Sequence, residues 1–575
     1  MGRFLTAFTL FMALATANAE NITPDYYAYP LEGVEQLYAG NVGEMRGGHF
    51  HAGVDIKSDG VEGKRVVAAA DGYISRVGLS SGGYGKVIYI THPNNTTTVY
   101  GHLSQYRDDI EKYVTRERAR TRQHSINLYF KSGQFPVKRG EFIALSGNTG
   151  SSGGPHLHYE VRKNETQSPI NIFRRGIIKP RDTQPPLLFT LHYIEIDSIG
   201  GVAYASPINS YKIVRDSNNL HTLDAPNNTI EVGRMGHFIV ECSDRKDGVT
   251  NTFGIYSLRG YRNSEPFFAY QNDGFTFKDS PYCKGVAYQP IKFDSRNEVV
   301  RMSISENHAK SFYYDTPNRG IIGCDQGESE SIKIEIEDDC ALKSTLTFNI
   351  TGNASPFEAT PVEAENMVFA SKDFSFNSDS LRVNVPRGTL YDSTPFAASI
   401  AETPKAKEAD SIKFLSPCIR VFSKEIALHK KMEVSLKCDI EPHLKEKVTI
   451  AMVSKKGDVY GINSEYRDGW VTAKSGNTGE FIVAIDDQAP KVIPNFSNGF
   501  NMGSHKFMSF KVSDNLSGIK DYECHIDDEW VPLDLEHGVL KHYFYHKPTQ
   551  SRHQLKLTVD DNCGNKTTIE REFIR

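Results

Sequence analysis

Polar and apolar residues alternate in short runs along much of the chain, the pattern expected of β-strands with one buried face. The run HLHYEVR shows it clearly, because successive side chains of a strand point to opposite faces. His156, His158 and Glu160 then share one side, and the apolar residues between them share the other. The apolar side predicts a core face, whereas two imidazoles side by side indicate a chemical role.

Glycine and proline turns divide these runs into segments, and the predicted fold class is mainly β. Up to about residue 180 the runs predict a mostly antiparallel β-sheet domain, which ends at the proline-rich hinge KPRDTQPP (Lys179 to Pro186). The predicted division is an N-terminal domain at 20–180 with an insert at 105–136, module 1 at 187–355, a β-rich middle module at 357–485 and module 2 at 487–575.

Modules 1 and 2 repeat one pattern. The segment ESIKIEIEDDCALKSTLTFNI (Glu330–Ile350) aligns with HQLKLTVDDNCGNKTTIEREF (His553–Phe573), and VECSDRKDGVTNTFGI aligns with FKVSDNLSGI. Each copy has alternating strand residues, an acidic turn, a cysteine and a further strand. Two such copies with strands spaced by ~10 residues predict β-sandwich modules of Ig-like type.

The first residues have the pattern of a secretory signal peptide. Arg3 precedes the apolar run Phe4 to Thr16, and Ala17-Asn18-Ala19 matches a cleavage site, so residues 1–19 are expected to be removed. No later run approaches ~20 uninterrupted apolar residues, so no transmembrane segment is predicted. We therefore expect an exported protein of the periplasm or cell envelope, or one secreted further.

Composition narrows the classes of partner. The net charge of −5 gives no reason to expect binding to nucleic acid or to an anionic membrane. The eight cysteines all lie beyond residue 240, and their even number is typical of an oxidising compartment. They either pair within the C-terminal modules or remain buried thiols.

A second cluster of candidate ligands lies in HFHAGVDIKS. A fully extended chain would separate the Cα atoms of His51 and Asp55 by ~13 Å, too far to share one ion, but a bend at Gly53 would bring them together. With one nitrogen from the HLHYEVR strand, the donors would be nitrogen, oxygen and nitrogen. That set suits Zn²⁺ with a fourth position open for water, as in catalytic sites.

The segments HAGVD, VYGHLS, VKRGEFIALSGNTG and SGGPHLHYEVR, in this order, resemble the lysostaphin/LytM-like zinc metallopeptidases of family M23 over about residues 40 to 172. The resemblance implies one Zn²⁺ per chain, bound by His51, Asp55 and His158. It implies that His156 and His102 are catalytic. His156 takes a proton from the attacking water and later gives one to the leaving amine, and His102 stabilises the oxyanion.

The resemblance assigns no role to two neighbouring residues. His49 is expected to be a neighbour of the site and not a ligand. Glu160 either orients one of the histidines or is a structural or solvent-facing carboxylate.

Members of this family cleave peptide cross-bridges or stem peptides of bacterial peptidoglycan, so the resemblance implies an exported zinc endopeptidase whose substrate is a peptidoglycan peptide. The alternatives are a catalytically silent LytM-like regulator of another cell-wall hydrolase, and a zinc peptidase that acts on proteins. The C-terminal modules are expected to bind the cell wall or a protein partner. The insert, with its basic stretch Arg116 to Arg122, is longer than the family's connection. It could wall the substrate groove, cap the site, contact acidic wall polymers or form an ordinary surface helix.

Overall fold

The structure, a computed structural model, describes residues 23–199, 202–216, 220–360, 366–405, 412–544, 548–549 and 551–575. The predicted signal peptide, residues 1–19, lies outside the described residues. Strands make up most of the regular structure, as predicted. Among the described residues, no helix is both long enough and apolar enough to cross a membrane.

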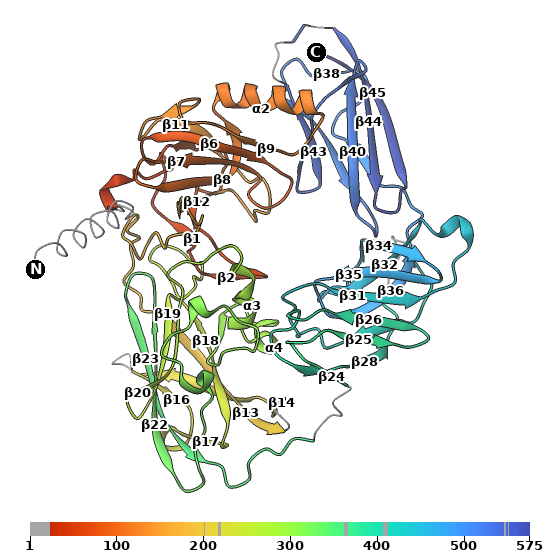
Figure 1. The fold of residues 1–575 in the computed structure, drawn as a ribbon. Coiled ribbons are helices and arrows are strands. Elements are labelled where there is room, and N and C mark those ends of the chain that lie inside the picture. Colours follow the sequence, from red (N-terminus) through yellow and green to blue (C-terminus); the bar gives the residue numbers. More distant parts are fainter. Residues whose placement is uncertain are drawn as a thin grey trace, which may run out of the picture.

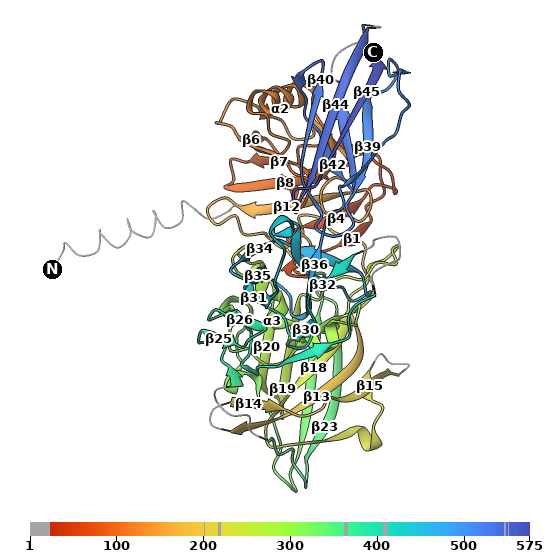
Figure 2. The same ribbon diagram turned by 90° about the vertical axis from the view of Figure 1, so that its right-hand side faces the viewer.

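The four predicted parts follow one another around a ring, and the last returns to the first (Figure 1). In both views the strands of module 2 lie beside helix α2 (Asp108–Thr121) of the N-terminal domain (Figures 1 and 2). Module 1 and the middle module lie at the other end of the molecule (Figure 2). The N-terminal domain therefore contacts the modules on two sides.

The N-terminal domain is built on an antiparallel sheet whose strand order differs from the chain order. Along the sheet the strands are β1 (Tyr38–Gly40), β4 (Val54–Lys57), β12 (His156–Lys163), β8 (Thr96–Tyr106), β7 (Lys86–Thr91), β6 (Gly72–Leu79) and β10 (Pro136–Val137). Beside this path, β11 (Phe142–Ser146) pairs with β5 (Arg65–Val67) and β8, and β9 (Ile126–Tyr129) pairs with β6. The central position of β12 places the HLHYEVR strand between β4 and β8.

Module 1 is a large curved sheet connected to the N-terminal domain by a short arm. The strands run in the order β20 (Glu265–Gln271), β19 (Ser257–Arg262), β22 (Ser329–Glu337), β23 (Lys343–Gly352), β16 (His221–Leu223), β15 (Asn209–Arg215), β13 (Leu187–Ile199), β18 (Gly236–Ser243) and β21 (Glu298–Arg301). Beside this path, β14 (Val202–Ala205) pairs with β13, and β17 (Thr229–Val232) pairs with β23. Two short helices, α3 (Cys283–Val286) and α4 (Gln289–Lys292), lie between β20 and β21 in the chain. The arm is the hairpin of β2 (Met45–Arg46) and β3 (His49–Phe50).

The middle module is a sandwich of two sheets. One contains β25 (Phe374–Asn377), β26 (Leu381–Val385), β31 (Met432–Lys437), β35 (Trp470–Ser475) and β34 (Ser464–Arg467). The other contains β28 (Ala398–Ala401), β30 (Cys418–Val421), β36 (Gly479–Ile485), β32 (Val448–Val453), β33 (Val459–Ile462) and β29 (Lys413–Phe414). Val434 and Val471 of the first sheet share one buried core with Ile450 and Phe481 of the second, and β24 (Met367–Val368) pairs with β27 (Thr394–Pro395) outside both sheets.

Module 2 is also a two-sheet sandwich with its own core. One sheet contains β37 (Lys491–Pro494), β39 (Phe507–Ser513), β43 (Val539–Tyr543) and β42 (Asp534–Glu536). The other contains β38 (Phe500–Asn501), β45 (Lys566–Ile574), β44 (Arg552–Asp561), β40 (Ile519–Ile526) and β41 (Glu529–Trp530). All eight cysteines are among the described residues of the modules, and every one is a free thiol; seven are buried and Cys340 is partly exposed, so the structure agrees with the buried-thiol alternative for seven of them.

Candidate metal centre

A bend at Gly53 brings His51 and Asp55 together, as the spacing predicts. The chain bends there before β4 begins, and His51 Nε2 lies 3.1 Å from Asp55 Oδ1. A Cβ atom at Gly53 would lie 2.4 Å from the carbonyl oxygen of Tyr159 and 2.9 Å from His158 Nε2. A side chain at this position would therefore clash with the neighbouring strand, which explains the need for glycine.

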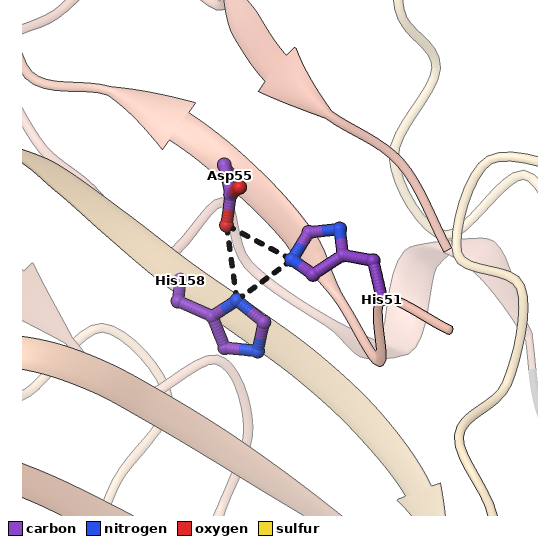
Figure 3. Close-up of side chains that lie close together, drawn as sticks. All are labelled: His51, Asp55 and His158. Carbon is purple, nitrogen blue, oxygen red and sulfur yellow. Dashed lines mark hydrogen bonds and ion pairs between the residues drawn. The ribbon is translucent and has the colours of Figure 1, made fainter. Parts of the chain in front are cut away.

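The third predicted ligand comes from β12. This strand pairs with β4 in a register that sets His158 opposite Asp55. His158 Nδ1 lies 2.9 Å from Asp55 Oδ1 and 3.0 Å from His51 Nε2, so three donor atoms converge on one point (Figure 3). The alternation predicted for β12 is confirmed, because its apolar side chains belong to the core of the domain.

The geometry and electrostatics of this cluster fit a small divalent cation. Tetrahedral Zn²⁺ with bonds of about 2.0–2.1 Å places its ligand atoms about 3.3–3.4 Å apart, a few tenths of an ångström more than the separations seen here. All three residues are at most 4% exposed. Burial would lower the pKa of His158, but its hydrogen bonds to Asp55 and Glu160 raise it to about 9. The pocket thus stabilises positive charge at the point that a metal ion would occupy.

In each histidine of the cluster, a hydrogen bond on the far side of the ring directs the other nitrogen at the metal position. His51 Nδ1–H donates to the carbonyl oxygen of Asn41 over 2.8 Å, which leaves the lone pair on Nε2. His158 Nε2–H donates to Glu160 Oε1 over 2.8 Å, so Nδ1 is the nitrogen that would bind an ion once it gives up the proton that it shares with Asp55. Such outer partners orient ligand rings and raise their basicity. Glu160, whose role was open, is fully buried and orients His158.

Two further residues of the same network hold Glu160 in place. Tyr84 donates its hydroxyl to Glu160 Oε1 over 2.6 Å, and Arg162 Nε lies 2.5 Å from Oε2. Burial would raise the pKa of Glu160, but the charge of Arg162 and the hydrogen bond from His158 lower it to about 2. Sequence reasoning missed Arg162, although its position two residues after Glu160 places it on the same face of β12 as the histidines.

The two predicted catalytic histidines lie beside the cluster, with their ring centroids 4.8 Å apart. His156 Nδ1–H donates to the carbonyl oxygen of Gly154 over 2.8 Å, and Nε2 lies 3.3 Å from Asp55 Oδ1 without a hydrogen bond. His102 Nδ1–H donates to the carbonyl oxygen of Thr149 over 2.8 Å. Burial, and then the nearby histidines, lower the pKa of His102 to about 3, so this ring is neutral.

His102 also has an unusual backbone conformation. Its φ of +59° lies in the left-handed region, which non-glycine residues rarely adopt and which is frequent at functional sites. No local pattern in YGHL signals this conformation. His49, by contrast, is exposed on the arm and is not part of the cluster of donor atoms, as expected.

The arm that carries His51 is anchored in module 1, which the sequence did not indicate. Met45, Phe50 and Ala52 belong to the buried core of module 1, not to that of the N-terminal sheet. The Asn41 side chain donates to Gly254 O over 2.9 Å and to Asp339 Oδ2 over 2.8 Å. The carbonyl that orients His51 is therefore fixed by module 1.

Arg46 of the same arm reaches the cluster directly. Its Nη2 atom lies 2.7 Å from Asp55 Oδ2, so one carboxylate oxygen is held by the guanidinium and the other faces the two histidines. Burial would lower the pKa of Arg46, but the neighbouring carboxylates of Asp55 and Glu44 raise it. No spacing signal in the sequence linked Arg46 to Asp55.

The insert contacts module 2 instead of standing alone on the surface. Its helix, α2, begins at Asp108, earlier than the basic stretch suggested, and buries Arg118. Arg118 Nη2 lies 2.7 Å from Asp534 Oδ1, and Lys86 Nζ of the sheet lies 2.9 Å from Asp534 Oδ2. All three side chains are at most 4% exposed. The ordinary surface-helix alternative is therefore wrong for the face of α2 that carries Arg118.

Module 2 also contacts the glycine-rich loop that leads to the H-x-H strand. His537 Nε2 donates to the carbonyl oxygen of Asn148 over 2.8 Å, next to the Thr149 carbonyl that holds His102. On the insert side, His124 donates from Nε2 to Tyr522 O and accepts the N–H of Leu533 at Nδ1. The last module thus buttresses the loop beside the candidate site.

An antiparallel sheet that brings an H-x-x-x-D bend and an H-x-H strand to one point defines a metallopeptidase-like domain. Comparison with known families agrees: residues 49–119 and 121–171 match the model of peptidase family M23, which confirms the resemblance for this part of the chain. Residues 365–486 match the model of the Zu5-like domain, which covers most of the middle module and ends one residue beyond its predicted boundary.

Three curated relatives are similar over the same region. An uncharacterized metalloprotease of Haemophilus influenzae is 40% identical over 114 residues, which are 20% of this chain and 19% of the relative. The DD-carboxypeptidase/endopeptidase Mpg of Neisseria meningitidis is 35% identical over 135 residues, 24% of this chain and 25% of the relative. The murein hydrolase activator NlpD of Salmonella dublin is 31% identical over 131 residues, 23% of this chain and 27% of the relative. The chain thus spans about a quarter or less of the length of these relatives.

Proposed function

We propose that this protein is a zinc-dependent endopeptidase of the bacterial cell envelope that hydrolyses peptide bonds of peptidoglycan. The observation that carries the proposal is the convergence of His51, Asp55 and His158 within 3.1 Å of one another, with His102 and His156 beside them. Similarity to a protein named as a DD-carboxypeptidase/endopeptidase supports the choice of substrate class.

The residues around the cluster supply proton transfer and orientation. When bound, Zn²⁺ would polarise the scissile carbonyl and acidify water. His156 is the general base, because the Gly154 carbonyl holds its proton on Nδ1 and leaves Nε2 free to accept one from the attacking water. The same nitrogen then returns the proton to the leaving amine. His102 is neutral with its proton on Nδ1, so it must take up a proton before Nε2 can donate to an oxyanion.

The competing function is that of a regulator of another wall hydrolase. Similarity to a protein named as a murein hydrolase activator favours it. Against it stands the complete set of donors, in which hydrogen bonds on the far side of each ring direct the ligand nitrogens of His51 and His158 at the cluster. A silent regulator has no use for this arrangement, so we favour the enzyme.

Digestion of purified peptidoglycan by the mature protein, read by mass spectrometry of the released muropeptides, tests the proposal. We expect wild type and a His49→Ala control, which removes an exposed histidine of the same arm, to reduce cross-linked products. We expect His156→Ala to leave them intact. Digestion of casein without digestion of peptidoglycan would favour a protein substrate, and stimulation of a wall amidase without any digestion would favour the regulator.

We also propose that the protein is exported and that its modules take part in binding the wall or a protein partner. The signal-peptide pattern of residues 1–19 supports export, and the modular repetition supports binding. Retention of residues 187–575 on purified peptidoglycan no greater than that of an unrelated sandwich domain would argue against a wall-binding role.

A further inference from the structure

Modules 1 and 2 carry similar groups of aspartates at one end. In module 1 this group surrounds an ammonium group: Lys246 Nζ lies 3.1 Å from Asp182, 3.1 Å from Asp244 and 2.7 Å from Asp339. Lys246 is 1% exposed. Its charge therefore compensates carboxylates that would otherwise be buried without a cation.

Module 2 has counterparts of three module 1 carboxylates, Asp182, Asp244 and Asp338, whereas Asn562 stands where module 1 has Asp339. The first pair is Asp182 and Asp486, which precede the first strand of their modules within the similar segments DTQPP and DDQAP. The second pair is Asp244 and Asp514, which directly follow β18 and β39. The third pair is Asp338 and Asp561, which lie at the start of equivalent hairpin turns.

These turns have the same hydrogen bonds. In both, Oδ1 of the aspartate accepts the N–H groups of the residues two and four positions further on, over 2.8–2.9 Å. The third pair of aspartates is therefore equivalent in structure as well as in sequence.

Module 2 lacks the cation that module 1 has in Lys246. In the alignment of VECSDRKDG with FKVSDNLSG, Lys246 corresponds to Leu516. The Leu516 side chain is buried with Cys418, Ala451 and Ile482 of the middle module. Among the ion pairs of the described residues, no lysine, arginine or histidine side chain pairs with any of the three aspartates of module 2. The module 2 group thus has three carboxylates and no internal counter-charge.

The oxygens of this group are oriented and in part unpaired. Asp486 and Asp561 are 0% exposed. Asp486 Oδ2 accepts the N–H of Ser517 over 2.9 Å and Asp514 Oδ2 accepts that of Gly518 over 2.7 Å, whereas Oδ1 of both aspartates is buried without a hydrogen-bond partner. Burial, and then the charges of Asp514 and Asp561, raise the pKa of Asp486. A fully buried carboxylate oxygen without a donor needs a cation or a proton.

We propose that Asp486, Asp514 and Asp561 bind a calcium ion at the junction of the middle module and module 2. Their ligand oxygens lie within 4.8 Å of one another, the span of two Ca–O bonds of about 2.4 Å on opposite sides of one ion. A set made only of oxygens suits Ca²⁺, whereas Zn²⁺ prefers nitrogen and sulfur. Asp486 follows β36 of the middle module and the other two belong to module 2, so the ion ties the two together.

The chain itself supplies a specific test variant. Leu516→Lys puts a lysine at the aligned position of Lys246, and we expect its ammonium to replace the ion; Asp514→Asn removes a ligand. Asp487→Asn is the matched control, because Asp487 is the half-exposed neighbour of Asp486 and lies outside the group. Full-length, zinc-loaded protein would be freed of calcium, and CaCl₂ binding measured by isothermal titration calorimetry and by equilibrium dialysis with ⁴⁵Ca²⁺.

We expect wild type and Asp487→Asn to bind one calcium ion that Asp514→Asn and Leu516→Lys do not bind, or bind at least tenfold more weakly, with unchanged zinc content. We also expect calcium to raise the melting temperature of wild type and not that of Leu516→Lys. Wild type that binds no calcium would overturn the proposal without any variant having to fold. Calcium binding that survives in both Asp514→Asn and Leu516→Lys would overturn the assignment to these residues, and equal affinity for MgCl₂ would overturn the choice of ion.

Discussion

One buried carboxylate of module 2, Asp534, compensates two buried cations of the N-terminal domain, and Asp534→Asn tests how much this contributes to the contact. The Asp534 side chain is 4% exposed and lies between Lys86 Nζ and Arg118 Nη2. The substitution keeps the size of the side chain and removes its charge. Two buried cations would then face each other without compensation, and we expect module 2 to separate from the sheet and from α2.

The magnitude follows from the pKa. Burial would raise the pKa of Asp534, but the charges of Lys86 and Arg118 lower it from the ordinary 3.8 to about 2. That difference corresponds to about 2.5 kcal/mol in favour of the charged form. Breaking a buried pair by removal of one partner costs about 3–5 kcal/mol in other proteins. The docking equilibrium should therefore shift by roughly 60-fold or more, since about 1.4 kcal/mol corresponds to a factor of ten.

Small-angle X-ray scattering and hydrogen exchange measure this shift. Opening of the ring in Figure 1 should increase the maximum dimension of Asp534→Asn, and amides of α2 should exchange faster, while exchange in the core of module 2 stays slow. Asp528→Asn, which removes an exposed carboxylate from the same module, should behave as wild type. Unchanged scattering and exchange in Asp534→Asn would refute the reasoning that this ion-pair network holds the contact.

Four further outcomes are expected. The contribution of Asp534 to docking should be complete above about pH 4 and lost as the pH falls towards about 2, because the pKa of Asp534 is lower in the docked state. Small-angle scattering across this pH range measures the loss, and a loss only above pH 4 would contradict the prediction. Glu160→Gln should weaken zinc binding about 10–100-fold in a chelator competition, since it removes the charge that orients the ligand ring; unchanged affinity would contradict this role. Gly53→Ala should lose zinc and stability, because its Cβ would clash with the Tyr159 carbonyl; a variant with full zinc content would show that the strands yield. Phe50→Ala should lower the free energy of unfolding in urea by about 3–5 kcal/mol, because Phe50 packs against Phe275 and Phe312 in module 1. It should also reduce zinc content, because Phe50 lies next to His51 on the arm; a fall in stability without loss of zinc would show that module 1 does not support the site.

The parts of the site that rest on local geometry could be predicted from the sequence. Strand alternation placed His156, His158 and Glu160 on one face, and the glycine between His51 and Asp55 implied the bend that joins them. Both follow from chain geometry within ten residues, and the register of β12 with β4 brings the two halves together.

The parts that rest on distant contacts could not be predicted. Asn41 binds Gly254, 213 residues away, and Arg118 binds Leu533 and Asp534, about 415 residues away. No periodic pattern encodes such pairs, because each side chain would be equally acceptable on a solvated surface. The anchoring of the arm in module 1 and the docking of module 2 therefore emerged only from the folded chain.

The most direct test of the proposed function is the rate of peptidoglycan cleavage measured against zinc content. Protein stripped of metal and titrated with ZnCl₂ should regain activity in proportion to bound zinc and reach its maximum at one ion per chain. Asp55→Asn should bind less zinc and stay inactive at the same total concentration. Cleavage that is independent of zinc, or no cleavage at one bound ion per chain, would contradict a catalytic metal centre of His51, Asp55 and His158.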